Sequence, residues 1–529
     1  MKKIFKYICL LVLPVTITLM PSCTDGFEDM NKSGQGIYDD DMLPDDNLVG
    51  AYFPGFQASV YFNYNYRAGT DWTFQLYQNL NSDMFSGYMS SPSFGVSSNL
   101  TYAMNDGWNS YAWTTSNGYT MANFMKMERK AKTYENLDVY TKWGKILKVA
   151  AMHRVADLYG PIIYSDYGKS DLGAAYDDVK TLYTQFFADL DEGIAGLEAY
   201  ETANPENARF VRVDNIYGAS MIQWVKFANS LRLKLAMNIV KADPAKAKEE
   251  AEKAINHKWG VLEAPSDIAK VSNMANPVAT ISNWGDCAMS ADMESILKGY
   301  EDPRLEKYFL PATNPKIKGE YKGIRLGTGV DREIYANSSA LNVTVSTPPV
   351  LLSPAEVYFL RAEGALRGWD MKGTAKELYE KGVTASFDQY GISGASTYLT
   401  STSLPAKYED KIVPANSHDA VNLVTPAWVE SDNNEVKLQK IMTQKWIAMF
   451  PDGSPAWTDY RRTGYPKLFP VVKNNSQGIV STELGPRRLP FPSSEAVDNA
   501  TNYADGVSKL GGADNAGTRL WWDVNKANF

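Results

Sequence analysis

The sequence predicts a mainly α-helical protein that also contains long irregular loops and few short strands. Apolar residues recur at helical spacing along several long segments. Strand signals are few and short, as at residues 341–346 and 478–481. A chain of 529 residues can bury a large core, and no linker interrupts its body. We therefore expect one large helical domain over residues 48–529.

The chain begins with an export signal over residues 1–22. Three lysines precede an apolar run at 8–20 that is too short and wrongly flanked for a stable membrane span. The run ends in Met-Pro-Ser-Cys, and lipoprotein processing requires a small residue before the cysteine. We expect Cys23 to be acylated and to anchor the protein in a membrane. The alternative is an incidental cysteine beyond an ordinary cleavage site.

A polar, acidic and glycine-containing segment at residues 23–47 has the composition of a flexible tether. Its aspartates, Asp39 to Asp41 and Asp45 to Asp46, lack the alternating ligands and central glycine of a calcium loop. The sequence therefore predicts no metal site here.

Helical stripes are expected in the body of the chain. They cover residues 143–158, 179–197, 221–235, 355–368 and 373–387. The last two segments form a pair of antiparallel helices, with small residues such as Gly364 and Ala375 where the helices cross. This pair is similar to a tetratricopeptide hairpin. No 34-residue period recurs, so a regular solenoid is not expected.

Residues 446–495 contain many prolines, which remove backbone donors and fix φ. We expect an ordered loop segment held by side chains, with structural roles for its arginines. Planar guanidinium groups can satisfy carbonyls and carboxylates there. These arginines are Arg461, Arg462, Arg487 and Arg488.

This segment resembles the carboxy-terminal signature of the SusD/RagB-like family of surface-anchored glycan-binding lipoproteins, especially its second large subfamily. Residues 215–238, 301–305 and 348–369 resemble blocks of the same family in the same order. The resemblance covers essentially the whole mature chain. It implies a SusD-like fold in which tetratricopeptide-like hairpins form a scaffold.

Charge and cysteine content exclude some partners and bonds. The formal charge is −8, and removal of a signal with three lysines and no acids makes it −11. Such a charge argues against nucleic acid as a partner. Once the signal is removed and Cys23 acylated, Cys287 is the one remaining thiol, so no intramolecular disulfide can form.

Catalytic motifs are scarce. The three histidines are far apart, and no HExxH or Gly-x-Ser-x-Gly motif occurs. His153 lies in an apolar helical stripe and is interpreted as a buried, satisfied imidazole. We predict no catalytic residue and no cofactor. Two carboxylates suffice for glycoside hydrolysis, however, so spacing alone leaves that chemistry open.

The positive functional signal is aromatic. Residues 51–120 hold 18 aromatic residues and eight asparagines beside four charged residues. Sugar C–H faces pack on aromatic rings, while amides and hydroxyls bind sugar hydroxyls. Trp72, Tyr77 and Trp113 lie among polar neighbours and are candidate ligand contacts. Helical spacing instead favours the core for Trp108 and Tyr111, as it does for Met121, Phe124 and Met125.

Trp284 and Asn283 are the best candidate pair. They lie in a long irregular region between Pro265 and Pro349, and loops of that length in a compact protein are commonly functional. In the family, ligand contacts come largely from loops ahead of the carboxy-terminal blocks, which favours the same pair.

The resemblance implies capture of oligosaccharide or polysaccharide at the outer-membrane surface. The ligand would be delivered to a SusC-like TonB-dependent transporter as part of a nutrient uptake system, with the tether acting as a hinge. Two alternatives remain open: a RagB-like lid that binds peptides, and an anchored helical glycan hydrolase or lyase.

Overall fold

The computed structural model describes residues 37–62, 72–94, 98–169, 173–206, 208–329 and 331–529. Its contacts divide the chain into two units, Met1–Leu48 and Val49–Phe529. The first unit contains the 3₁₀ helix η1 (Asp39–Met42), in which Asp41 accepts a hydrogen bond from the backbone of Tyr38 at 2.9 Å. The expected signal and Cys23 lie outside the described residues.

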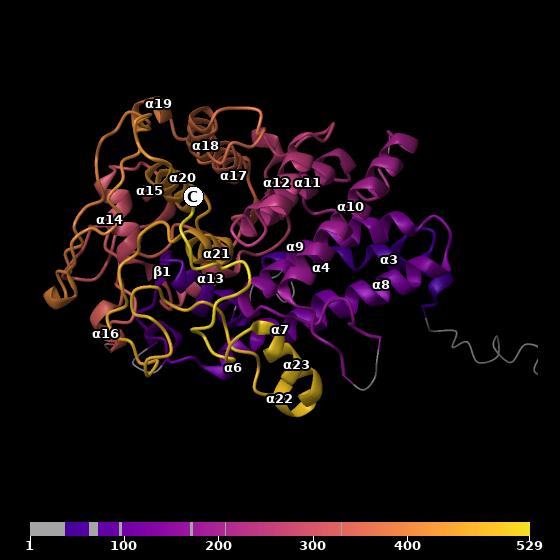
Figure 1. Ribbon diagram of the computed structural model, residues 1–529, viewed down its shortest axis with the longest axis horizontal. Coiled ribbons are helices and arrows are strands. Elements are labelled where there is room, and N and C mark those ends of the chain that lie inside the picture. Colours follow the sequence, from indigo (N-terminus) through magenta and orange to yellow (C-terminus); the bar gives the residue numbers. More distant parts are fainter. Residues whose placement is uncertain (1–36, 63–71, 95–97, 170–172, 207, 330) are drawn as a thin grey trace, which may run out of the picture. The chain divides into compact units, whose positions relative to one another are not determined.

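Long helices build the scaffold of the second unit (Figure 1). They are α8 (Ala122–Thr133), α9 (Asp138–Tyr159), α10 (Val179–Ala203), α11 (Met221–Asn238), α12 (Pro244–Ile255), α17 (Pro354–Leu366), α18 (Ala375–Gln389), α20 (Asn434–Ala448), α21 (Gly453–Thr463) and α23 (Ala500–Leu510). Helix α10 packs against α9 and α11, α11 against α12 and α17, and α17 against α18 and α20. The predicted helical stripes therefore form one packed series, and the mainly α class is confirmed.

Shorter helices connect and cover this scaffold. They are α4 (Phe53–Val60), α5 (Trp72–Phe74), α6 (Asp106–Asn109), α7 (Tyr111–Ser116), α13 (Pro277–Asn283), α14 (Ala291–Gly299), α15 (Leu305–Tyr308), α16 (Arg332–Tyr335), α19 (Ala395–Tyr398) and α22 (Glu495–Asp498). Helix α3 (Asn47–Gly50) contains the sequence boundary between the two units. Two π-helical stretches, η2 (Gln75–Asp83) and η4 (Asn117–Met121), continue α5 and α7. Three further 3₁₀ turns are η3 (Asn99–Thr101), η5 (Pro265–Asp267) and η6 (Pro414–Asn416).

The predicted tetratricopeptide-like hairpin is the pair α17 and α18. Ser353 caps α17, because its hydroxyl accepts from the backbone of Glu356, and Pro354 occupies the first turn, where no donor is needed. Thr374 and Glu377 form a capping box at the start of α18. Small Gly382 lets the two helices approach closely, since a Cβ there would lie 2.7 Å from the Phe359 ring.

The described strands form two small antiparallel pairs, β1 (Met89–Ser90) with β3 (Ala288–Met289) and β2 (Ala269–Lys270) with β4 (Val350–Leu352). Neither predicted strand segment forms one. At 341–346, Leu341 makes a single bridge to Phe309, and Thr344 to Thr347 then fold into a turn through the Thr347 hydroxyl. The second segment turns at Gly478, whose φ is +84°.

The carboxy-terminal segment is only partly the loop that its prolines predict. Residues 453–463 form α21, because Pro455 falls in the first helical turn, where it removes no intrahelical donor. From Gly464 to Ser494 the chain forms no further helix or strand, as expected.

The arginines of this segment do hold backbone and carboxylates together. Arg461 donates to the carbonyl of Asp157 at 2.6 Å, and Arg462 binds the Glu363 carboxylate at 2.7 and 2.8 Å. Arg487 binds Asp523, and Arg488 binds the carbonyl of Tyr159 at 2.9 Å. Their predicted structural role is confirmed.

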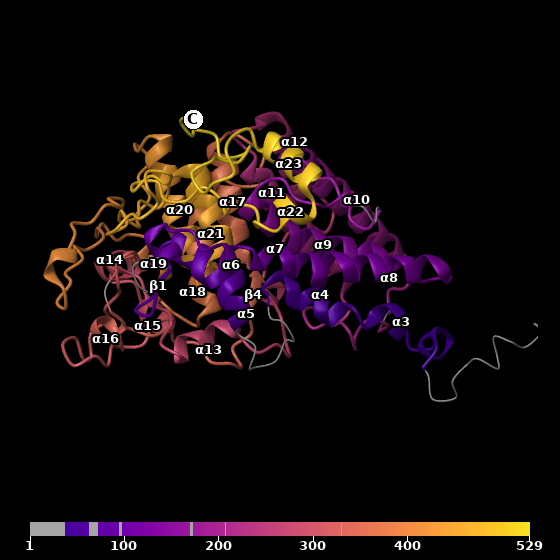
Figure 2. The same ribbon diagram turned by 90° about the horizontal axis from the view of Figure 1, so that it is seen from below.

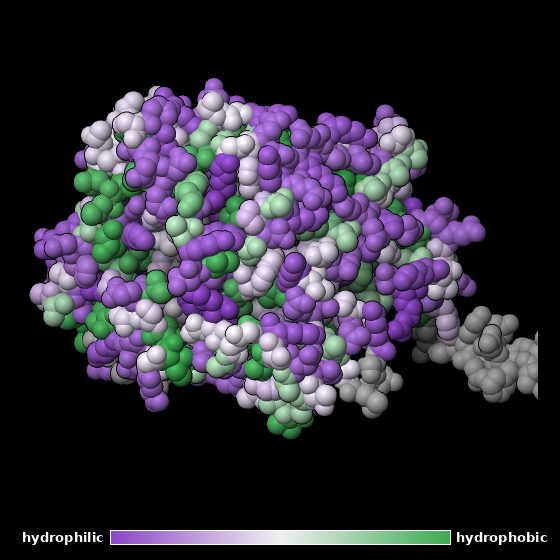
Figure 3. All heavy atoms as spheres, viewed as in Figure 1, coloured by the Kyte–Doolittle hydropathy of each residue, from purple (hydrophilic) through white to green (hydrophobic). Residues whose placement is uncertain are grey.

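Large aromatic side chains fill the core, including Trp143, Trp224, Trp446, Trp457 and Trp522. Within the described residues, no helix has both the length and the apolar character to cross a bilayer. The face drawn in Figure 3 mixes hydrophilic and hydrophobic residues without one broad apolar surface.

Candidate functional site

Two tryptophans present large faces to solvent. Trp284 is 41% exposed and Trp72 is 49% exposed, although tryptophan is usually among the more buried residues. Asn283, the polar neighbour of Trp284, is also exposed. Two of the predicted ligand-contacting tryptophans are thus accessible.

Helix α13 positions Trp284. Asn276 caps its start by accepting from the backbone of Val278 at 3.2 Å, and Pro277 fits the first turn. The helix ends at Asn283, and Trp284 is its C-cap residue. Gly285 follows with a φ of +74°, a conformation that glycine adopts without strain. This ending places the Trp284 indole on a short, well-defined turn.

Side chains from three other segments hold this turn. The β1–β3 pair brings Ser93 to it, and the Ser93 hydroxyl donates to the Gly285 carbonyl at 3.0 Å. Arg332 in α16 donates to the Trp284 carbonyl at 2.6 Å, and Gln75 donates to Asp286 at 3.0 Å. Hydrogen bonds from three separate segments therefore fix the position of the turn that carries Trp284.

Trp72 lies on the neighbouring helix α5, which packs against α13. Figure 2 draws both helices toward the lower edge of the view. The Trp72 ring meets Tyr111 of α7 edge to face, with ring centroids 5.6 Å apart and an angle of 62°. Both exposed tryptophans thus project from elements that pack directly on each other.

A second aromatic pair lies near the same turn. Phe94, which follows Ser93, contacts Trp108 at 5.2 Å between centroids, and both are half-buried. The expected core placement is therefore wrong for Trp108 and Tyr111, which remain partly accessible because α6 and α7 are short surface helices. It holds for Met121 and Phe124, which are buried, whereas Met125 is half-buried.

Tyr77 and Trp113 do not form part of this surface. Tyr77 is 2% exposed, stacks on Phe62 at 4.8 Å and bonds to the Ser116 hydroxyl at 2.9 Å. Trp113 is 4% exposed and donates its indole N–H to Glu495 at 3.0 Å. Neither ring offers a free face to a ligand, so these two site predictions are corrected.

The sequence interpretation took the polar neighbours of Tyr77 and Trp113 as a sign of solvent exposure, but those neighbours are themselves buried. Gln78 donates to Asp83 at 2.9 Å and to Asp452 at 3.1 Å. Asn109 accepts from Asn99 at 2.7 Å. A buried polar network satisfies its own donors and acceptors, so amide-rich sequence does not by itself indicate a wet surface.

Titratable groups with shifted pKa values are likewise buried. Burial raises the pKa of Asp83 and of Asp292 to about 7 and that of Asp157 to about 6. All three side chains are nearly inaccessible. They do not present a carboxyl pair to a surface ligand.

His153 and Cys287 are also enclosed. His153 bonds to the Val149 carbonyl at 2.9 Å, and burial lowers its pKa well below the usual range. Burial raises the pKa of the Cys287 thiol, the only free cysteine described. Across the described residues, no cluster of three histidine, cysteine or acidic side chains could hold a metal ion.

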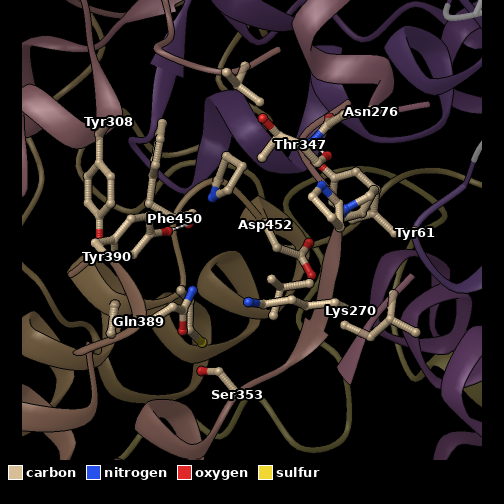
Figure 4. Close-up of a pocket in the computed structure, with 18 of the residues that line it drawn as sticks. Tyr61, Lys270, Asn276, Tyr308, Thr347, Ser353, Gln389, Tyr390, Phe450 and Asp452 are labelled. Carbon is tan, nitrogen blue, oxygen red and sulfur yellow. Dashed lines mark hydrogen bonds between the residues drawn. The ribbon is translucent and has the colours of Figure 1, made fainter. Parts of the chain in front are cut away.

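A cavity of about 290 Å³ adjoins the amino-terminal end of α13 and was not anticipated from the sequence (Figure 4). Asn276 lines it, together with β4, the 448–452 segment and the rings of Tyr308 and Tyr390. Neither Trp72 nor Trp284 lines it. No motif marks this cavity, because distant segments assemble it.

Solved structures with the same helical fold show which class of protein this is. A chitin-binding SusD homologue from Flavobacterium johnsoniae is 47% identical, with a TM-score of 0.87 over 91% of this chain and 100% of that chain. A SusD homologue from Bacteroides vulgatus is 39% identical, with a TM-score of 0.88 over 92% and 100%. One from Bacteroides uniformis is 36% identical, with a TM-score of 0.82 over 90% and 99%. No curated protein matches the chain.

A comparison with models of protein families agrees with the structural matches. The sequence model of the SusD-like family, described as SusD and RagB outer membrane lipoproteins, matches residues 29–523. This chain belongs to the SusD-like family.

Proposed function

We propose that this protein is a non-enzymatic, lipid-anchored subunit that captures glycan on the cell surface and delivers it to a SusC-like TonB-dependent transporter. The observation that carries the proposal is the pair of exposed tryptophans, Trp72 and Trp284, on adjoining elements α5 and α13. Rigid aromatic faces beside neutral amides suit the C–H faces and hydroxyls of sugars.

The ligand is proposed to be neutral. Arg332 and Asp286, the charged groups that hold the Trp284 turn, lie 3.7 Å apart and offset each other. Asn283 and the Trp72–Tyr111 pair add no further charge. Since the Flavobacterium relative is described as chitin-binding, oligomers of β-1,4-linked N-acetylglucosamine are the first ligands to test.

The test uses the lipid-free mature protein from Thr24 onward in calorimetry. Chitooligosaccharides are compared with cellulose, xylan and starch oligomers and with mixed peptides, and each mixture is analysed for cleavage. We expect one glycan class to bind without product, and Trp284→Ala and Trp72→Ala each to weaken binding about tenfold, or roughly 1.4 kcal/mol. Trp259→Ala, at a half-buried tryptophan after α12, serves as the matched control.

Other outcomes would change the proposal. Product accumulation would make the protein an enzyme, and binding of peptides alone would favour the RagB-like alternative. Unchanged glycan affinity in both tryptophan variants would move the site elsewhere. Delivery and anchoring have their own measurements: co-purification with a TonB-dependent transporter, and palmitate labelling that is lost in Cys23→Ser.

A further inference from the structure

The cavity beside the amino-terminal end of α13 has walls that are largely apolar. Prolines and aliphatic residues of the 343–352 segment form one side, and residues 448–455 form another. Tyr308 stacks on Phe450 with centroids 4.7 Å apart and donates its hydroxyl to the Ile447 carbonyl at 2.9 Å. Tyr390 donates to the Phe450 carbonyl at 3.4 Å, a bond drawn in Figure 4. These contacts fix the positions of both tyrosine rings in the cavity wall.

The two carboxylates that line the cavity are already neutralised. Asp452 receives two hydrogen bonds from Arg154, at 2.7 and 2.8 Å. Glu356 lies 3.1 Å from Lys234 and 3.7 Å from Lys445. The cavity interior therefore has little unbalanced negative charge that would repel an anion.

Two lysines that line the cavity, unlike its carboxylates, are not neutralised by an ion pair among the described residues. Lys270 and Lys307 are exposed, and within the described part of the chain neither side-chain amine pairs with a carboxylate or donates a hydrogen bond. In Figure 4 the Lys270 side chain extends across the drawn cavity. Tyr61, also in the wall, is 2% exposed, and its hydroxyl has no hydrogen-bond partner among the described residues. Apolar walls thus meet positive charge at the mouth and one unsatisfied donor in the wall.

We propose that this cavity binds a small organic anion, with its apolar body against the proline and tyrosine walls and its carboxylate at the Lys270 and Lys307 amines. A volume of about 290 Å³ lies at the small end of ligand pockets, which suits one ring with a short acidic chain. The net negative charge of the protein repels an anion only weakly at this cavity, because salt screens charges that lie beyond about 10 Å. This second site is independent of the tryptophan surface.

The experiment compares two probes of the same shape by calorimetry and protein-observed NMR. The probes are 3-phenylpropionate and its neutral counterpart 3-phenylpropanamide. We expect the carboxylate to bind at least about fivefold more tightly than the amide, and Lys270→Met and Lys307→Met each to weaken it about two- to fivefold. Because both lysines are exposed, these variants should fold normally, which a melting curve checks.

Controls make the result decisive. Lys132→Met, at an exposed lysine of α8, should leave binding of 3-phenylpropionate unchanged. Val343→Trp, in the half-buried cavity wall, should abolish binding of both probes by filling the space. Equal affinity for acid and amide, no binding of either, or an equal effect of Lys132→Met would overturn the proposal.

Discussion

Arg332 illustrates how a single side chain organises the candidate surface. Its guanidinium donates to the Trp284 carbonyl and lies 3.7 Å from Asp286, although the side chain is half-exposed. An exposed ion pair alone contributes little stability. The value of Arg332 is positional, because it ties α16 to the turn that carries the exposed indole.

Replacing Arg332 should therefore affect binding more than folding. In Arg332→Ala we expect glycan affinity to fall about three- to tenfold, because the turn loses a charge-assisted hydrogen bond, with little change in melting temperature. Arg332→Lys should recover part of the loss. Calorimetry and thermal melts measure both quantities, and a large fall in melting temperature would assign Arg332 a structural role instead.

Asp83 predicts a pH dependence of stability. It is fully buried, it accepts from the Gly453 backbone at 3.0 Å, and burial raises its pKa from 3.8 to about 7. Between these values the unfolded chain loses a proton that the folded protein keeps. Asp83 therefore contributes full stability below about pH 4, and the contribution is lost as pH rises to 7, by about 1.4 kcal/mol per unit.

Asp83→Asn removes this titration and leaves an acceptor for the Gly453 backbone. We expect the variant to lose less stability than the wild type between pH 4 and 7, as measured by urea unfolding at each pH. Asp505→Asn, at an exposed aspartate of α23, should follow the wild-type profile. Parallel profiles for wild type and Asp83→Asn would show that Asp83 is ionised throughout.

Among the helices, two glycines predict opposite effects of the same substitution. Gly382 faces Phe359 across the α17–α18 hairpin, and an added methyl would lie 2.7 Å from that ring. Gly55 in α4 has no atom within 4 Å of the position of an added Cβ. Gly382→Ala should destabilise by about 1–3 kcal/mol through overpacking, whereas Gly55→Ala should stabilise by about 0.5–1 kcal/mol.

Thermal or urea unfolding of the two variants tests this contrast. Equal shifts in both would mean that helix propensity, and not the closeness of the α17–α18 crossing, decides stability at Gly382.

Long helices were predictable because their burial is local and periodic: α10 and α11 begin at Val179 and Met221, where their apolar stripes begin. Helix α21 was missed because its position relative to Pro455, not the presence of proline, decides whether a helix forms. Only some of the candidate site residues could be predicted from the sequence. Long irregular sequence pointed to Trp284, but only tertiary packing separates exposed Trp72 from buried Trp113.

Across the whole molecule, the carboxy-terminal segment returns to helices more than 300 residues earlier. The backbone of Leu489 donates to the Leu158 carbonyl at 2.7 Å, and the Ser493 hydroxyl donates to Asp106 at 2.7 Å. These contacts bury Trp113 against Glu495. No local sequence pattern marks such distant partners. The burial of Trp113 could therefore not be predicted without the tertiary structure.

The distribution of charge in the whole molecule distinguishes the two proposed sites. The chain carries a formal charge of −8, but a neutral glycan on Trp72 and Trp284 experiences no net force from it. We therefore expect glycan affinity to change less than about twofold between 50 and 500 mM NaCl, whereas 3-phenylpropionate, held by exposed lysines, should weaken severalfold as screening shortens from roughly 14 to 4 Å. Calorimetry at both salt concentrations measures this. A steep salt dependence for the glycan would mean that its ligand is charged, and would contradict a neutral oligosaccharide as the captured molecule.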